Sequence, residues 1–91
     1  MNNPEKRREK YEQAREFYAA RQHERALRLL DALEREIPDD RDVLYARALC
    51  LAALSRSYEA RLIFRRLQKL YGDGPWTKES AALHAPTIED E

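Results

Sequence analysis

The chain contains few residues of the types that catalysis or metal binding requires. Its soft and imidazole ligands are His23, His84 and Cys50. These residues do not follow the C-x-x-C, H-x-x-x-H or H-E-x-x-H spacings that are typical of zinc sites. A lone cysteine excludes an internal disulfide, and we expect Cys50 to be a small, buried apolar residue. The sequence therefore predicts no metal site and no cofactor.

Catalytic motifs are also missing from the sequence. The only glycines are Gly72 and Gly74, so no glycine-rich phosphate loop can form. No serine, histidine and acid can be grouped into a nucleophilic triad. We therefore expect a protein that is not an enzyme and has no small-molecule substrate.

One run of cations could bind a charged partner. Arg61, Arg65 and Lys69 are spaced four residues apart, which places them on one side of a helix, and Arg66 lies beside them. We call the first three the basic ridge. A nucleic-acid surface would need a longer ridge interleaved with aromatic residues. The ridge is interpreted as a solvated outer face, basic by chance or complementary to an acidic partner or tail.

The overall charge does not favour nucleic acid or membrane either. The 91 residues include 17 basic and 17 acidic side chains, so no net field attracts the chain to a polyanion or an anionic bilayer. The N-terminal charges are not followed by an apolar segment of the kind found in secretory signals. The expected location is the cytoplasm, and we expect neither nucleic acid nor membrane as a partner.

The basic ridge and the other side chains must be positioned around one apolar stretch, residues 43–54. Arg47 is its only charged residue, and it contains neither glycine nor proline. Its length suits an ordinary globular helix but falls far short of the roughly 20 residues that span a bilayer. Because a helix that is apolar on nearly every face is normally covered on nearly every face, the flanking segments should be helices packed around it. This pattern predicts an all-α fold.

Four further helices are predicted from apolar periodicity and from stop signals. They cover residues 4–20, 23–36, 58–71 and, more briefly, 75–84, with an acidic tail at 86–91. The turns between the first four helices are so short that neighbouring helices should be antiparallel. The expected capping residues are Asn3, Asp39 or Asp40, and Ser57, and the expected left-handed stop is Gly72.

The helices also repeat. The numbers of Ala26 and Ala60 differ by 60 − 26 = 34, and the same step, which we call the repeat step, aligns Ala14 with Ala48. Further aligned pairs are Tyr11 with Tyr45, Phe17 with Leu51, Leu30 with Phe64, and Leu33 with Leu67. A helix-turn-helix period of about 34 residues is the signature of tetratricopeptide repeats.

On these residues the chain resembles the tetratricopeptide repeat family. Residues 7–40 and 41–74 resemble two repeats after a lead-in at 1–6, and residues 75–85 resemble a truncated first helix that caps the array. Lys10 departs from the family pattern, which has a large apolar residue there. Leu33 and Leu67 stand where the family prefers alanine, and Gly72 replaces the second closing proline.

In that family the first helices of successive repeats line a concave groove that holds a peptide or a helix of another protein. Carried over by the repeat step, the resemblance implies groove positions at Tyr11, Arg15, Tyr18, Tyr45, Leu49, Ala52, Glu79 and Leu83. The sub-family that grips C-terminal carboxylates has Lys and Asn at such positions, so that ligand is not implied. The aromatic and aliphatic character predicts an amphipathic helix or an apolar extended segment as ligand. The alternative is that some of these residues belong to the core.

The expected function is that of an adaptor or dedicated chaperone that binds a segment of another protein. The alternative is a structural subunit that self-assembles through its open repeat ends, because two repeats and a short helix leave apolar faces uncovered. A homo-oligomer would satisfy that need. Trp76 could either cover the fourth helix or stay exposed as a contact for a partner. The basic ridge is a further possible contact.

Overall fold

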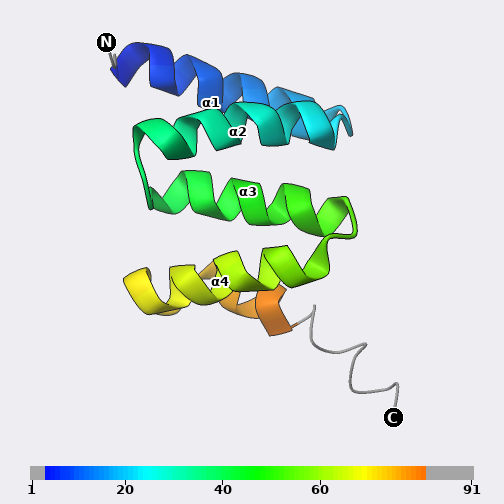
Figure 1. Ribbon diagram of the computed structural model, residues 1–91, viewed down its shortest axis with the longest axis vertical. Helices are drawn as coiled ribbons and strands as arrows, with labels where there is room; N and C mark the ends of the chain where they lie inside the picture. Colours follow the sequence, from blue (N-terminus) through cyan, green and yellow to red (C-terminus); the bar gives the residue numbers. More distant parts are fainter. Residues whose placement is uncertain (1–3, 82–91) are drawn as a thin grey trace.

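The computed structural model describes residues 4–81, and over that range every regular element is a helix (Figure 1). The helices are α1 (Pro4–Ala19), α2 (His23–Glu36), α3 (Arg41–Ala53) and α4 (Ser57–Tyr71). Residues 75–81 form a fifth helical segment. The predicted all-α fold is confirmed. The predictions for Asn3, for the end of the fifth helix and for the acidic tail lie outside the described residues.

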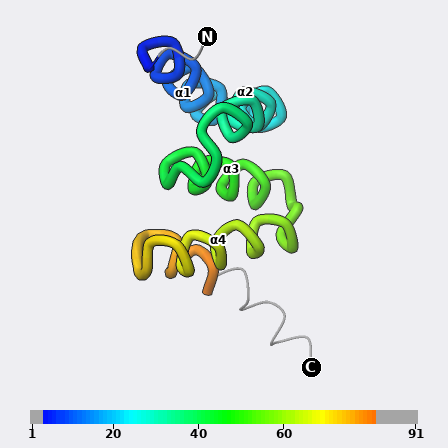
Figure 2. Tube along the Cα trace, turned by 60° about the vertical axis from the view of Figure 1, so that its left-hand side comes forward, coloured from blue at the N-terminus to red at the C-terminus, as the bar shows by residue number. Residues whose placement is uncertain are grey.

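The four helices are stacked one after another, and residues 75–81 lie alongside α4 (Figures 1 and 2). Neighbouring helices in the sequence are also neighbours in space, whereas α1 and α3 contact each other only slightly. Each short turn reverses the chain, so the stack is a series of antiparallel pairs. This is the packing expected for a helical repeat.

Two helix starts show how far capping could be predicted. The Asp40 carboxylate accepts the Val43 N–H at 3.1 Å, which caps α3 as one of the two expected aspartates. The prediction that Ser57 caps α4 is wrong: Arg56 precedes the helix without a side-chain cap bond, and Ser57 is the first helical residue. The Arg56 side chain instead bonds Glu59, with its Nε 2.7 Å from Oε1.

The turn after α1 and the turn after α3 have the same backbone structure. Arg21 and Ser55 have φ values of 65° and 64°, although neither is glycine. The next N–H groups, of Gln22 and Arg56, each donate to a carbonyl five residues earlier at 2.8 Å. This bond pattern closes a helix C-terminus as a Schellman motif. Because Arg21 and Ser55 are one repeat step apart, the repeat seen in the sequence extends to the hydrogen bonds of the backbone.

The core is continuous from α1 to the fifth helical segment. Its largest fully buried side chains come from α2, α3 and α4, and α1 contributes only Ala14. The buried residues are Ala14, Ala26, Leu27, Leu30, Leu33, Val43, Leu44, Ala48, Cys50, Leu51, Ala60, Phe64, Leu67 and Trp76. The apolar stretch that begins at Val43 is therefore covered on most of its surface, whereas Tyr45 and Leu49 are only half-buried.

The sequence allowed Trp76 either to cover the fourth helix or to stay exposed, and the structure shows it buried. Only 6% of its surface is exposed, and its indole Nε1 donates to the Gly72 carbonyl at 2.8 Å. Gly72 has φ 77°, a conformation that favours glycine. At Gly74 a Cβ atom would lie 2.4 Å from the indole ring, so only glycine fits beneath it. The two glycines therefore allow the chain to fold the indole against α4.

Ion pairs connect the helices along the stack. Lys10, at the position where the resemblance calls for an apolar residue, pairs with Glu36 of α2 at 2.9 Å. Arg47 of α3 pairs with Asp31 of α2, also at 2.9 Å. These pairs are partly exposed, so we expect each to contribute little stability by itself.

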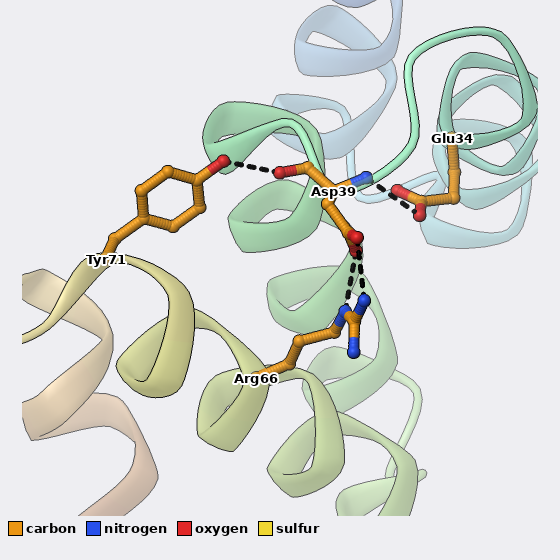
Figure 3. A network of polar contacts seen from close by, with 4 residues as sticks. All are labelled: Glu34, Asp39, Arg66 and Tyr71. Atoms are coloured by element: carbon orange, nitrogen blue, oxygen red, sulfur yellow. Dashed lines mark hydrogen bonds and ion pairs between the residues drawn. The ribbon is translucent and has the colours of Figure 1, made fainter.

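The turn between α2 and α3 is held by a network centred on Asp39 (Figure 3). Arg66 of α4 makes two bonds to the Asp39 carboxylate, at 2.6 and 2.7 Å. The Tyr71 hydroxyl donates to the Asp39 carbonyl, and the Asp39 N–H donates to Glu34. Asp39 itself has φ 64°. The network therefore joins the end of the first helix pair to the last full helix.

The first prediction concerns the turn at Ser55. A non-glycine residue in this left-handed region costs about 1–2 kcal/mol, while glycine costs about 0.5–1 kcal/mol of additional chain entropy. Ser55→Gly should therefore stabilise the protein by about 0.5–1 kcal/mol, measured by urea unfolding. Ser57→Gly, two residues on and helical, is the control and should not stabilise. Equal effects at both positions would contradict the explanation.

The second prediction concerns acid. The hydrogen bond from Arg66 lowers the pKa of Asp39 below its ordinary value. A lowered folded-state pKa gives stability above the ordinary aspartate pKa, and this stability is lost as pH falls through the folded value. Arg66→Ala should therefore lower the urea midpoint at about pH 7, and the difference from wild type should shrink towards about pH 3.

Arg28→Ala is the control for this prediction, because Arg28 is exposed on α2 and forms no ion pair within residues 4–81. It should leave the midpoint nearly unchanged at every pH. A difference between Arg66→Ala and wild type that stays constant with pH would show that Arg66 acts by packing.

Candidate partner-binding groove

The side chains of α1 and α3 border a hollow of about 330 Å³. Leu30 of α2 contributes to it from between these helices. Five of the eight groove positions implied by the repeat step line this one hollow: Tyr11, Arg15, Tyr18, Tyr45 and Leu49.

The remaining implied positions fall elsewhere. Ala52 is half-buried in α3 and does not line the hollow. Glu79 is exposed in the fifth helical segment, close enough to Tyr45 for its charge to influence that hydroxyl. Leu83 lies outside the described residues. The groove is therefore defined on α1 and α3.

Three of the implied positions that line the hollow also pack against the core. Tyr11, Tyr45 and Leu49 are half-buried and pack against the buried cluster. The Tyr45 ring makes edge contacts with Phe64 and Trp76, at centroid distances of 6.3 and 6.1 Å. These residues thus support the core with one side and face the hollow with the other.

Charge and polarity vary along the groove. Burial raises the pKa of Tyr11, with a smaller contribution from the Asp42 carboxylate. Burial also raises the pKa of Tyr45, followed by the charge of Glu79. Both phenols remain protonated at neutral pH and can donate hydrogen bonds. Arg15 is exposed and is the only cation among the lining residues.

The lining residues that the repeat step did not identify are mostly small. Ala14, Ala19 and Ala46 leave space between the tyrosines, and Leu30 and Cys50 complete the lining. Ala46 and Cys50 are one helical turn apart on α3, next to Leu49. The repeat step transferred only one set of groove positions per helix and therefore did not identify Ala46 and Cys50. Their i, i+4 spacing beside Leu49 could have indicated that they share its side of the helix.

The other candidates from the sequence have structural positions. His23 begins α2 and makes an edge contact with the Tyr18 ring, with centroids 5.0 Å apart. Cys50 is only 1% exposed. His84 lies outside the described residues. Within residues 4–81, no three His, Cys, Asp or Glu side chains are grouped so that they could hold a metal ion.

The basic ridge lies on α4, away from the groove. Arg65 and Lys69 are exposed, and the Arg61 guanidinium lies over the Tyr58 ring, 5.8 Å from its centroid. Arg66, beside the ridge, is occupied by Asp39. In the part of the chain that the structure describes, none of the helices has both the length and the apolar character needed to cross a bilayer.

Comparison with protein-family models, with curated proteins and with solved structures finds no match to this chain.

The third prediction concerns the thiol in the lining of the groove. Burial, followed by the charge of Asp31, raises the pKa of Cys50 to about 11. Since the thiolate is the reactive form, native Cys50 should react with a thiol reagent at about pH 8 roughly 100-fold more slowly than in the unfolded chain. Ellman's reagent with and without urea measures this ratio. Similar rates in both states would show that the groove opens to Cys50 in the native protein.

Proposed function

We propose that this chain is a tetratricopeptide-like interaction module that binds a segment of another protein in the groove between α1 and α3. The ligand is an amphipathic helix or an apolar extended segment. The module acts as an adaptor or dedicated chaperone, and its place of action is the cytoplasm.

The observation that carries this proposal is the character of the groove. Apolar and aromatic side chains line it, and Tyr45 and Leu49 from α3 remain partly accessible to solvent. Accessible contiguous apolar surface with a polar rim is typical of interaction sites. Tyrosine and arginine are enriched at the residues that dominate binding energy, and Tyr18 and Arg15 stand exposed at the edge.

The titratable groups of the groove favour binding over catalysis. A nucleophile needs an adjacent base or a lowered pKa. Burial raises the pKa of Cys50, so its thiolate is disfavoured. The two half-buried phenols are shifted in the same direction and act as hydrogen-bond donors at neutral pH.

The repeated geometry supports the tetratricopeptide assignment. The two turns with positive φ at Arg21 and Ser55 are one period apart. The buried alanines follow the same period, Ala14 with Ala48 and Ala26 with Ala60. Matching turns and matching close contacts are what a helix-turn-helix repeat of this period requires.

A second candidate function is self-assembly through the end of the stack. Among the described residues, five large hydrophobic side chains are exposed, and four of them lie on α4: Tyr58, Leu62, Leu70 and Tyr71. A second copy that packs against α4 could cover Leu62 and Leu70, which lie two helical turns apart.

The fourth prediction separates the two functions. Leu49→Glu places a charge in the groove and should reduce the enrichment of peptides from a random displayed library by at least about tenfold. The library should yield apolar anchors spaced i, i+3 or i+4 with the wild-type protein. Circular dichroism checks that Leu49→Glu is still helical.

Leu70→Glu is the matched control, because it introduces the same charge on α4 outside the groove. It should leave peptide selection unchanged. If self-assembly is the function, Leu70→Glu should instead lower the mass measured by light scattering, and Leu49→Glu should not. Peptide selection that survives Leu49→Glu would rule out the groove.

A further inference from the structure

A second hollow, of about 540 Å³, lies between α2, α3 and α4. On α3 it uses Leu44 and Arg47, whereas the groove uses Tyr45 and Leu49, so the two hollows lie on different faces of the same helix. We call it the α2–α4 hollow. Its full lining is Glu34, Leu44, Arg47, Leu62, Ile63, Arg65, Arg66 and Lys69.

The α2–α4 hollow has cations that the described residues do not neutralise. Arg47 and Arg66 are paired with Asp31 and Asp39. Arg65 and Lys69 make no ion pair within residues 4–81. Both belong to the basic ridge, so one side of the hollow carries unpaired positive charge.

The same hollow has an unsatisfied acceptor and an apolar surface. Glu34 Oε2 accepts the Asp39 N–H, but Glu34 Oε1 is buried and has no hydrogen-bond partner. A buried acceptor without a partner is costly and is usually satisfied by a donor that is not in view. Leu62 is 46% exposed beside it. Glu34 Oε1 is enclosed by the protein, so the surface of the hollow offers two features to an occupant, the unpaired cations and the apolar Leu62. A segment with carboxylates and an apolar side chain would match both.

We propose that residues 82–91 of this chain bind across α4 at the α2–α4 hollow. Their sequence is Ala-Leu-His-Ala-Pro-Thr-Ile-Glu-Asp-Glu, which places Ile88 directly before the acids Glu89, Asp90 and Glu91. Ile88 packs against Leu62, and the acids pair with Arg65 and Lys69. This surface is separate from the groove, and the inference does not depend on the proposed function.

The position where this segment begins makes the contact reachable. Ala81 lines a third hollow together with Phe64, Arg65 and Trp76, so Arg65 borders both this hollow and the α2–α4 hollow. From Ala81 to Ile88 are seven residues, which span up to about 23 Å when extended. The helix to be crossed is about 10–12 Å wide with its side chains.

Connection in one chain favours this occupant over a separate molecule. A short flexible connection gives an effective concentration in the millimolar range, so weak contacts suffice. Exposed charge pairs are screened by salt, and the contact should therefore weaken as the ionic strength rises. An acidic segment of another protein would have to displace residues 82–91 to reach the basic ridge.

Disulfide formation tests the contact in the full-length chain. The test pair is Leu62→Cys with Thr87→Cys, which keeps Ile88 and the acidic residues and replaces Leu62 with a smaller apolar side chain. The control pair is Lys78→Cys with Thr87→Cys, also exposed and closing a shorter loop, which chain entropy favours. Native Cys50 is buried, with its pKa raised to about 11, and can stay. At about 20 mM salt the test pair should form at least about tenfold faster than the control pair.

Two further results are expected. The advantage of the test pair should disappear at about 0.5 M salt, and also in the triple variant Glu89→Lys, Asp90→Lys and Glu91→Lys. Adding Arg65→Glu and Lys69→Glu to that triple variant should restore the faster disulfide formation of the test pair. A test pair no faster than the control pair would overturn the proposal. So would disulfides that form mainly between molecules, since the occupant would then be a second copy.

Discussion

The stacking of the helices depends on close approach at four alanines. Ala14, Ala26, Ala48 and Ala60 are at most 1% exposed, so all four are enclosed where the helices approach, and Ala14 also borders the groove. The distance between packed helices is set by the side chains at the contact. Because the alanines recur at the same step as the turns, both helix pairs approach in the same way, and the larger residues around them fill the core. The groove follows from this arrangement, since it is bordered by equivalent faces of α1 and α3.

The fold was largely predictable because its signals are local. The bounds of α2 were predicted at His23 and Glu36, where the apolar period and the flanking turns agree. Ser57 was misassigned because whether a residue precedes a helix or begins it depends on the turn before. That turn has positive φ at Ser55, and the sequence gives no indication of this because the residue is not a glycine. The bonds of Asp39 to Arg66 and Tyr71 join residues 27 and 32 positions apart and could not be read from spacing.

The sequence predicted most of the helix positions that line the hollow, but not its width or the smaller residues that complete its lining. The repeat step brought five side chains to one hollow, because equivalent positions of equivalent helices face the same way. It missed Ala46 and Cys50, since the width of a groove depends on how far the helices separate. The position of Trp76 could not be decided either, because its partners Tyr45 and Gly72 are brought to it only by the folded chain. The α2–α4 hollow was signalled only by its basic ridge.

The two walls of the groove differ in how firmly they are held. Ala14 is the only buried residue of α1, whereas five residues of α3 are buried. A helix anchored by so little buried surface opens locally at a lower free energy than the rest of the protein, and its amides exchange with solvent sooner. The α3 wall of the groove is therefore held more firmly by the core than the α1 wall. Binding of the proposed segment would therefore include the free-energy cost of ordering α1.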